Sequence, residues 1–384
     1  MNGIYYYLIA FIAIWLVALL FKKQLEKFGV DVNFPVLMWK TTRLRGFIDR
    51  LANISPRFWK WYMNVGIVVS FIGMITILYF IINSLSTITT TPSVSIIIPG
   101  VEVPGSPIFI PFFYGIIGLV TVLVVHEFSH GILTRVEKLK VKSIGLLLFA
   151  ILPGAFVEPD EEEIKKASRI SRMRVYAAGS IANMSLAIIA LAIAFLISNV
   201  AIAGTFHEDG IKIDSLVANS PSTNILESGM VIKEINGVKI TNISSYMAVA
   251  SNIKPQENIT ISTNQGNHII QVGTNPQNNS RGYMGLHLAQ NYGIKKDVSD
   301  VWGDQAPWAL FNLFELFHWI FLLNISVGLF NLLPISMLDG GHLLRDLLRW
   351  KLSEKVVKPV TSILSYFLII IIVISIGYGL ISGL

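Results

Sequence analysis

Long apolar runs separated by polar connections dominate this chain. Six of these runs reach about 18 residues with few charges, long enough to cross a hydrocarbon core of roughly 30 Å as helices. They cover residues 4–21, 65–82, 108–133, 175–203, 308–333 and 360–381. The first run lacks a basic segment before it and a cleavage site after it, so we expect an uncleaved anchor. The pattern predicts a multi-pass helical membrane protein.

Composition and charge support this interpretation. Hydrophobic residues make up 53% of the chain and charged residues only 14%, which excludes an ordinary soluble domain. The net charge of +6 does not indicate a nucleic-acid partner, because the basic residues cluster in residues 22–60, 138–174 and 345–358. Residues 83–107 contain only one charged residue, Glu102. By the positive-inside rule, we expect six spans with both termini extracytoplasmic. We expect the membrane to be a prokaryotic cell membrane, with the lipid bilayer as partner.

Two connecting segments contain apolar residues without being long enough to span. In the first connection, apolar residues recur near helical spacing among Lys and Arg, which predicts a helix on the membrane surface or, alternatively, a solvated basic loop. These residues are Leu37, Leu44, Phe47, Ile48 and Leu51. Residues 143–157 form either a re-entrant segment or a cytoplasmic hairpin, because they are apolar but too short to cross.

Residues 204–304 differ in composition from the rest of the chain. Short alternating apolar segments lie among Asn, Ser, Thr and Gly, which predicts a small soluble α+β domain. Asn236-Gly237 between two such segments indicates a hairpin, because a two-residue turn needs positive φ values. A helix at residues 244–251 and a second hairpin around residues 264–266 complete a β-β-α-β-β order.

Part of this domain resembles the PDZ domains of bacterial and archaeal proteases. The residues that carry the resemblance are VANSPSTNILESGMVIKEINGVKITN and, after them, IKPQENITIS. The resemblance implies that an exposed strand edge pairs with a peptide and that a backbone nest holds the C-terminal carboxylate of that peptide. A Gly-Leu-Gly-type carboxylate loop is not recognisable, so a steric filter is the alternative.

The strongest chemical signal is HEFSH at residues 126–130, inside the third predicted span. Positions i and i+4 of a helix lie about 40° apart around the axis, so His126 and His130 face one point with Glu127 at the edge. This arrangement suits zinc bound by two His nitrogens and a Glu that accepts a proton from water. A pair of satisfied His residues is the alternative, but ionisable groups are rare and costly at membrane depth.

Asp339 is the candidate for a third ligand. A catalytic zinc needs three protein ligands, and the chain contains no cysteine. Pro334 and the neighbouring glycines predict a break after the fifth span, and Asp339 follows that break. Because the third and fifth spans both run inward, His126 and Asp339 belong to the cytoplasmic side of the membrane. Taken alone, Asp339 has a helix cap as its alternative role.

The two motifs together are similar to those of the site-2 protease family, the intramembrane zinc metalloproteases of peptidase M50 type. HEFSH lies in one span, FNLLPISMLDGGH follows a later one, and the PDZ-like domain lies between them. The apolar spans predict a membrane all-α core of about six helices into which the small α+β domain is inserted. The N-terminal membrane half is residues 1–203, the extracytoplasmic PDZ-like domain is residues 204–304, and the C-terminal membrane half is residues 305–384.

The resemblance also implies roles. One Zn²⁺ per chain would be bound by His126, His130 and Asp339, with Glu127 as general base. The activity would be that of a metalloendopeptidase in regulated intramembrane proteolysis, and its substrates would be transmembrane proteins whose helices partly unwind.

Two asparagines are candidates for substrate or transition-state support. Gly179 and Asn183 match a Gly-x-x-x-Asn motif of the family, although Ser180 replaces its common Pro. A buried amide needs a partner, and a substrate backbone or an oxyanion would serve; close packing of the small residues around Asn183 is the alternative. Asn331, one turn before Pro334, has a helix cap as its alternative role.

Other polar groups suggest rival functions. Glu315 and His318 share a helix face but lie toward the outer end of the fifth span, so we expect interfacial or packing roles. His342 is either a partner of Asp339 or a solvated loop residue. A transporter would show internal repeats, which are absent, and a scaffold would not require Glu127. An ectodomain hydrolase would rely on His207, His268 and His287, which lack a nucleophile motif.

Overall fold

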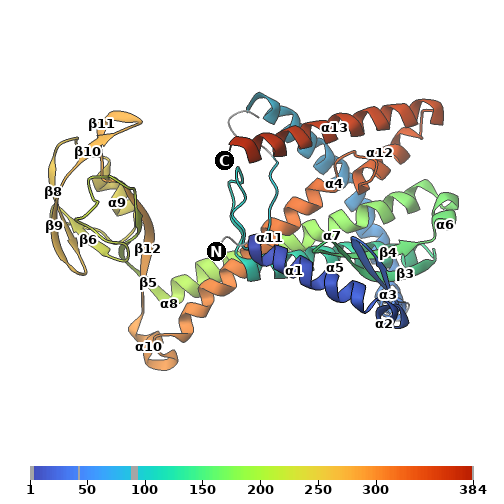
Figure 1. The fold of residues 1–384 in the computed structure, drawn as a ribbon, viewed down its shortest axis with the longest axis horizontal. Coiled ribbons are helices and arrows are strands. Elements are labelled where there is room, and N and C mark those ends of the chain that lie inside the picture. Colours follow the sequence, from blue (N-terminus) through green and yellow to red (C-terminus); the bar gives the residue numbers. More distant parts are fainter. Residues whose placement is uncertain (1–3, 42–43, 88–93, 383–384) are drawn as a thin grey trace. The chain divides into compact units, whose positions relative to one another are not determined.

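The computed structural model describes residues 4–41, 44–87 and 94–382 (Figure 1). The chain divides into two compact units, of which unit 1 is Met1–Ala194 with Phe314–Leu384, and unit 2 is Phe195–Leu313. Each unit has a hydrophobic core of its own.

Among the described residues, five helices are long and apolar enough to cross a membrane. They are α4 (Pro56–Asn83), α5 (Phe112–Val136), α7 (Arg169–Leu196), α11 (Ala309–Phe330) and α13 (Glu354–Ser382). The five correspond to the last five predicted spans. Helix α1 (Ile4–Leu20) is apolar but has only 17 residues, so a sixth span stays a prediction.

Shorter elements connect these helices. They are α2 (Lys22–Lys27), α3 (Arg45–Ile54), η1 (Ser84–Thr87), α6 (Glu161–Lys166), the π-helix η2 (Ile197–Ile202), α8 (Ala203–Thr205), α10 (Lys296–Trp302), η3 (Ala306–Trp308) and α12 (Asp339–Leu348). In unit 1, α7 contributes small buried residues, Ala177 and Ala178, to a core shared with α4 and α5. Small residues let neighbouring helices approach closely, which brings α7 near the histidines of α5.

A four-stranded antiparallel sheet belongs to unit 1. Its order is β1 (Val30–Asn33), β2 (Val36–Thr41), β3 (Val141–Phe149) and β4 (Leu152–Pro159), so that β4 is an edge strand. Residues 143–157 thus form a hairpin, and that hairpin pairs through β3 with the first connection.

The predicted surface helix in the first connection is wrong in part. Leu37 lies in β2, where it pairs with Leu148, because a distant strand offers the backbone partners that a local helical pattern cannot reveal. Phe47, Ile48 and Leu51 do lie on a helix, α3, but Ile48 is completely buried in the core of unit 1 rather than exposed on a surface.

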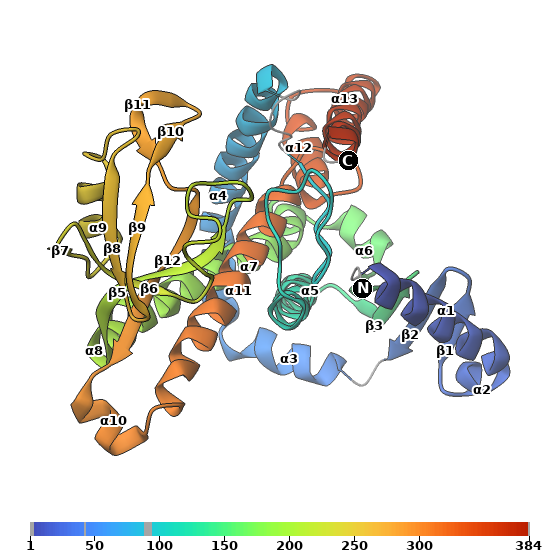
Figure 2. The ribbon, with the colours of Figure 1, turned by 60° about the vertical axis from the view of Figure 1, so that its left-hand side comes forward.

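Unit 2 contains a curved sheet with α9 (Ile243–Ala250) against it (Figures 1 and 2). The sheet order is β12 (Leu286–Ile294), β5 (Phe206–Leu216), β6 (Val231–Ile235), β8 (Asn258–Thr263) and β9 (Gly266–Gln271), with β7 (Val238–Lys239) on β6; β10 (Gly273–Asn275) pairs with β11 (Asn278–Tyr283). Both predicted hairpins are confirmed, and Asn236 and Gly237 have φ values of 50° and 77°. The flanking strands β5 and β12 were not predicted.

Candidate metal centre

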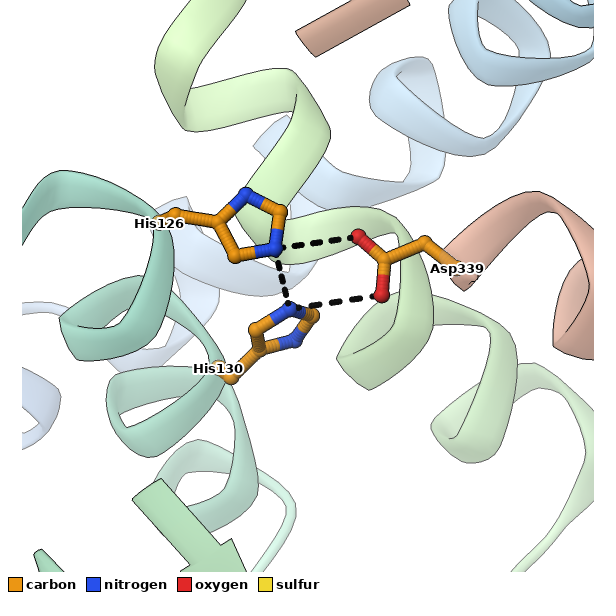
Figure 3. A group of neighbouring side chains, drawn as sticks. All are labelled: His126, His130 and Asp339. Carbon is orange, nitrogen blue, oxygen red and sulfur yellow. Dashed lines mark hydrogen bonds and ion pairs between the residues drawn. The ribbon is translucent and has the colours of Figure 1, made fainter. Parts of the chain in front are cut away.

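Helix α5 directs two imidazole rings toward one point (Figure 3). The Nε2 atoms of His126 and His130 lie 3.2 Å apart. The Nε2 of His126 is 3.5 Å from Oδ2 of Asp339, and the Nε2 of His130 is 3.4 Å from Oδ1. Asp339 therefore completes the group from a different helix. Within the described residues, this is the one cluster of three or more His, Asp or Glu side chains that could hold a metal ion.

Asp339 reaches the histidines because the chain turns sharply between α11 and α12. It is the first residue of α12, directly after the break that the sequence predicts. The N–H of Gly340 donates to the carbonyl of Asn331 at 2.8 Å and ties the start of α12 to the end of α11. A Cβ at Gly340 would lie 2.0 Å from the carbonyl oxygen of Leu332, so this path requires glycine.

Helix α7 contacts the rings of His126 and His130, and its Gly179 leaves open space beside their Nε2 atoms. Nδ1 of His130 donates to the carbonyl of Val175 at 2.8 Å, so a neutral ring keeps its lone pair on Nε2. One turn further along α7, a Cβ at Gly179 would lie 2.5 Å from Nε2 of His130 and 2.6 Å from Nε2 of His126. A metal-binding His needs both this tautomer and this open space.

Two polar side chains of α7 contact the other two members of the group. The hydroxyl of Ser180 donates to Oδ2 of Asp339 at 3.0 Å. The side-chain amide of Asn183 lies 3.3 Å from Nδ1 of His126. Both side chains are completely buried. Sequence reasoning missed the contact of Ser180, which it treated only as a departure from the family motif.

The three side chains lie close enough together to share one metal ion. Zinc bonds of about 2.0–2.1 Å place tetrahedral ligand atoms roughly 3.3 Å apart. The two Nε2 atoms lie 3.2 Å apart, and each is 3.4 or 3.5 Å from a different carboxylate oxygen of Asp339. Facing lone pairs and a buried carboxylate are unfavourable unless a cation or a proton lies among them. Two nitrogens and one carboxylate also leave a fourth position for water, as in catalytic zinc sites.

Glu127 is held beside this group by the sheet. Its Oε2 accepts a hydrogen bond of 2.9 Å from the N–H of Val157 on β4. The carboxylate is thereby fixed between α5 and an edge strand that pairs only with β3 among the described strands. Sequence reasoning did not find this contact, because no local pattern links residues 127 and 157.

The remaining candidates lie outside the metal group. His318 stacks on Phe314 with ring centroids 5.8 Å apart, which is a packing role, and Glu315 is not part of the cluster. His342 stacks on Tyr176 at 4.8 Å, and burial lowers its pKa. The side chain of Asn331 forms no hydrogen bond with another described residue, whereas its carbonyl holds Gly340.

Unit 2 has a cavity of its own. A hollow of about 440 Å³ lies between α9 and the start of the edge strand β12. Tyr246 and Met247 line it from the helix, and the turn before β12 contains Gly285, whose φ of +73° favours glycine. Sequence reasoning missed this turn because β12 was not predicted.

Comparison with known proteins identifies the family. Residues 114–375 match the model of Peptidase family M50. The chain is 30% identical to an uncharacterized protein of Methanocaldococcus jannaschii over 234 residues, 61% of this chain and 56% of that relative. It is 22% identical to a membrane-bound transcription factor site-2 protease homolog of Arabidopsis thaliana over 138 residues, 36% of this chain and 27% of that relative.

The chain thus spans about half the length of the first relative and about a quarter of the second. The family match, in contrast, covers well over half of this chain and includes all three residues of the metal group and Glu127. The chain therefore belongs to peptidase family M50, a family of membrane proteases.

Proposed function

We propose that this protein is an intramembrane zinc metalloprotease that hydrolyses peptide bonds of membrane-spanning proteins. The observation that carries the proposal is the convergence of His126, His130 and Asp339, with ligand atoms within 4.8 Å of one another, on helices of a membrane core, with Glu127 beside them. These three residues would hold one Zn²⁺ per chain. When bound, the ion would polarise the scissile carbonyl and acidify a water molecule.

Glu127 acts as the general base and then as the general acid. Because Val157 holds one carboxylate oxygen of Glu127, the other oxygen can accept the proton of the attacking water and later deliver it to the leaving amine nitrogen. The hydrogen bond also restrains the side chain, so that little conformational freedom is lost during proton transfer.

The substrate segment must be extended at the site, because a helix conceals its carbonyl carbons behind its own hydrogen bonds. Among the described strands β4 pairs only with β3, so its other edge, where the N–H of Val157 is bonded to Glu127, can receive such a segment beside the proposed base. A substrate strand on this edge would present its backbone to the metal group. This arrangement supports cleavage of transmembrane substrates that partly unwind.

We further propose that unit 2 is an extracytoplasmic PDZ-like domain inserted in a core of six spans. The cavity between α9 and the edge strand β12 has the form that suits an added peptide strand, with the turn at Gly285 at one end to receive a C-terminal carboxylate. We infer that this domain binds peptide C-termini, with the metal group toward the cytoplasmic side.

A comparison of wild type with Glu127→Gln tests the function. Both proteins are purified in detergent and assayed on several single-span substrates with zinc or with chelator, and the products are identified by mass. Glu315→Gln is the matched control, since it removes a carboxylate from a spanning helix outside the metal group. We expect Glu127→Gln to bind zinc and lose at least about 100-fold in cleavage rate. Cleavage by Glu127→Gln at the wild-type rate would refute the role of Glu127, and zinc binding without cleavage by wild type would favour a scaffold.

A further inference from the structure

We infer that Asn183 is a positioning residue that fixes the tautomer of His126 by accepting a hydrogen bond from its Nδ1–H. This inference rests on the proposed metal centre and deepens it. It assigns Asn183 to the support of a ligand rather than to contact with the substrate, and it makes α7 the element that orients all three ligands.

The first observation is the direction of the two rings. His126 and His130 turn their Nε2 atoms toward each other and toward Asp339, so both Nδ1 atoms point away from the metal group. A neutral imidazole that binds a metal through Nε2 must carry its proton on Nδ1, and that N–H needs an acceptor. For His130 the acceptor is the carbonyl of Val175 at 2.8 Å.

The second observation is that Asn183 occupies the equivalent place for His126. Val175 and Asn183 are eight residues, roughly two turns, apart on α7, and His126 and His130 are roughly one turn apart on α5. The side chain of Asn183 lies 3.3 Å from Nδ1 of His126. One helix face therefore serves both rings, with Gly179 between the two contacts.

The third observation is an unsatisfied atom. With the amide nitrogen directed at His126, Oδ1 of Asn183 is buried without a hydrogen-bond partner. A nitrogen donor at this place would also force the proton of His126 onto Nε2, where it would block the metal. The oxygen and nitrogen of a side-chain amide are assigned from the hydrogen bonds that they form. Turning the Asn183 amide by 180° would place its Oδ1 where it accepts a hydrogen bond from Nδ1–H of His126. The metal-binding state requires that orientation.

Helix α11 fixes Asn183 in this position. Gly328 of α11 approaches so closely that a Cβ there would lie 3.4 Å from Cβ of Asn183 and 3.1 Å from the carbonyl oxygen of Ser180. Asn183 is completely buried under this contact, so a bulk water molecule does not substitute for its oxygen. On the same turn of α7, the hydroxyl of Ser180 orients Asp339.

The test measures metal binding and ligand geometry in addition to activity. Wild type, Asn183→Leu and Asn183→Asp are compared for Zn²⁺ affinity by chelator competition and for the visible spectrum of the Co²⁺ form. The Leu variant removes the acceptor and the Asp variant keeps one. Asn324→Leu is the control, because Asn324 is an equally buried amide on α11 that donates to Thr121 instead of a ligand. Asn183→Ala removes the acceptor without added bulk, should Leu prevent folding.

We expect Asn183→Leu to lose about 10–100-fold in Zn²⁺ affinity and to change the Co²⁺ spectrum, while Asn183→Asp stays within about threefold of wild type. Asn324→Leu should bind like wild type. Wild-type affinity in Asn183→Leu would overturn the inference, and the carbonyl of Gly179, which also faces His126, would then be the sufficient acceptor. Equal losses in the Leu and Asp variants would overturn it as well. Failure of the wild type to bind zinc would instead refute the proposed function.

Discussion

Replacing Gly179 with alanine should abolish metal binding without unfolding the protein. The added Cβ would lie 2.5 Å from Nε2 of His130 and 2.6 Å from Nε2 of His126, whereas ordinary contact begins near 3.4 Å. The ring of His130 must therefore retreat by about 0.9 Å and the ring of His126 by about 0.8 Å, several times the roughly 0.2 Å that metal–ligand distances tolerate. Because alanine favours a helix over glycine by about 1 kcal/mol, α7 itself should not suffer.

The assay for this prediction is zinc stoichiometry and affinity in detergent, with thermal unfolding of the chelated protein as the test of folding. We expect at least a 100-fold loss of affinity, on the order of the effect of misplacing a ligand. Gly377→Ala is the matched control, since it makes the same substitution in α13 where no heavy atom lies within 4 Å of the new Cβ. Wild-type zinc affinity in Gly179→Ala would show that the ion does not lie among these three side chains.

Three further predictions concern other parts of the chain. Arg172→Met should lower the free energy of unfolding of the chelated protein by roughly 3 kcal/mol in a denaturant titration. The substitution leaves Asp346 without its main partner, since this carboxylate is only 2% exposed and bonds to Arg172 at 2.7 and 3.0 Å. Adding Asp346→Leu should restore most of the lost stability. Asp160 caps α6, and the hydrogen bond from the N–H of Glu163 lowers the pKa of the Asp160 carboxyl below its ordinary 3.8. Hydrogen-exchange protection of the Glu163 amide should therefore persist above pH 3.8 and disappear as the pH falls through the lower pKa of the folded state. Residues 204–304, expressed alone, should unfold cooperatively in urea, because their buried isoleucines form a separate core; a gradual transition would contradict this.

The part of the site that could be predicted from sequence is the part that helical geometry determines. The spacing of HEFSH places His126 and His130 on one face of a helix whatever surrounds it. Asp339 could be found because Pro334 and the glycines mark a break at a definite depth. The structure brings these residues together at 3.2 to 3.5 Å, and the family match includes all of them.

The part that could not be predicted depends on contacts between segments far apart in the chain. Strand β2 pairs with β3 more than a hundred residues later, so the apolar residues around Leu37 gave a misleading helical pattern. Val157 contacts Glu127 through its backbone N–H, which carries no sequence signature. Ser180 was similarly invisible as a support for Asp339, because a buried hydroxyl reveals its partner only when the helices are packed.

The position of Asp339 has a consequence for the biosynthesis of the protein. The ligand follows His130 by 209 residues, and all of unit 2 lies between them. At about 5–20 residues per second, a ribosome needs roughly 10–40 s to travel from one motif to the other. During that interval α5 can enter the membrane with its two histidines, but Asp339, the third residue of the metal group, does not yet exist. Under the proposed function, a nascent chain would therefore be incapable of cleaving its neighbours until the start of α12 had been synthesised and had packed against α7.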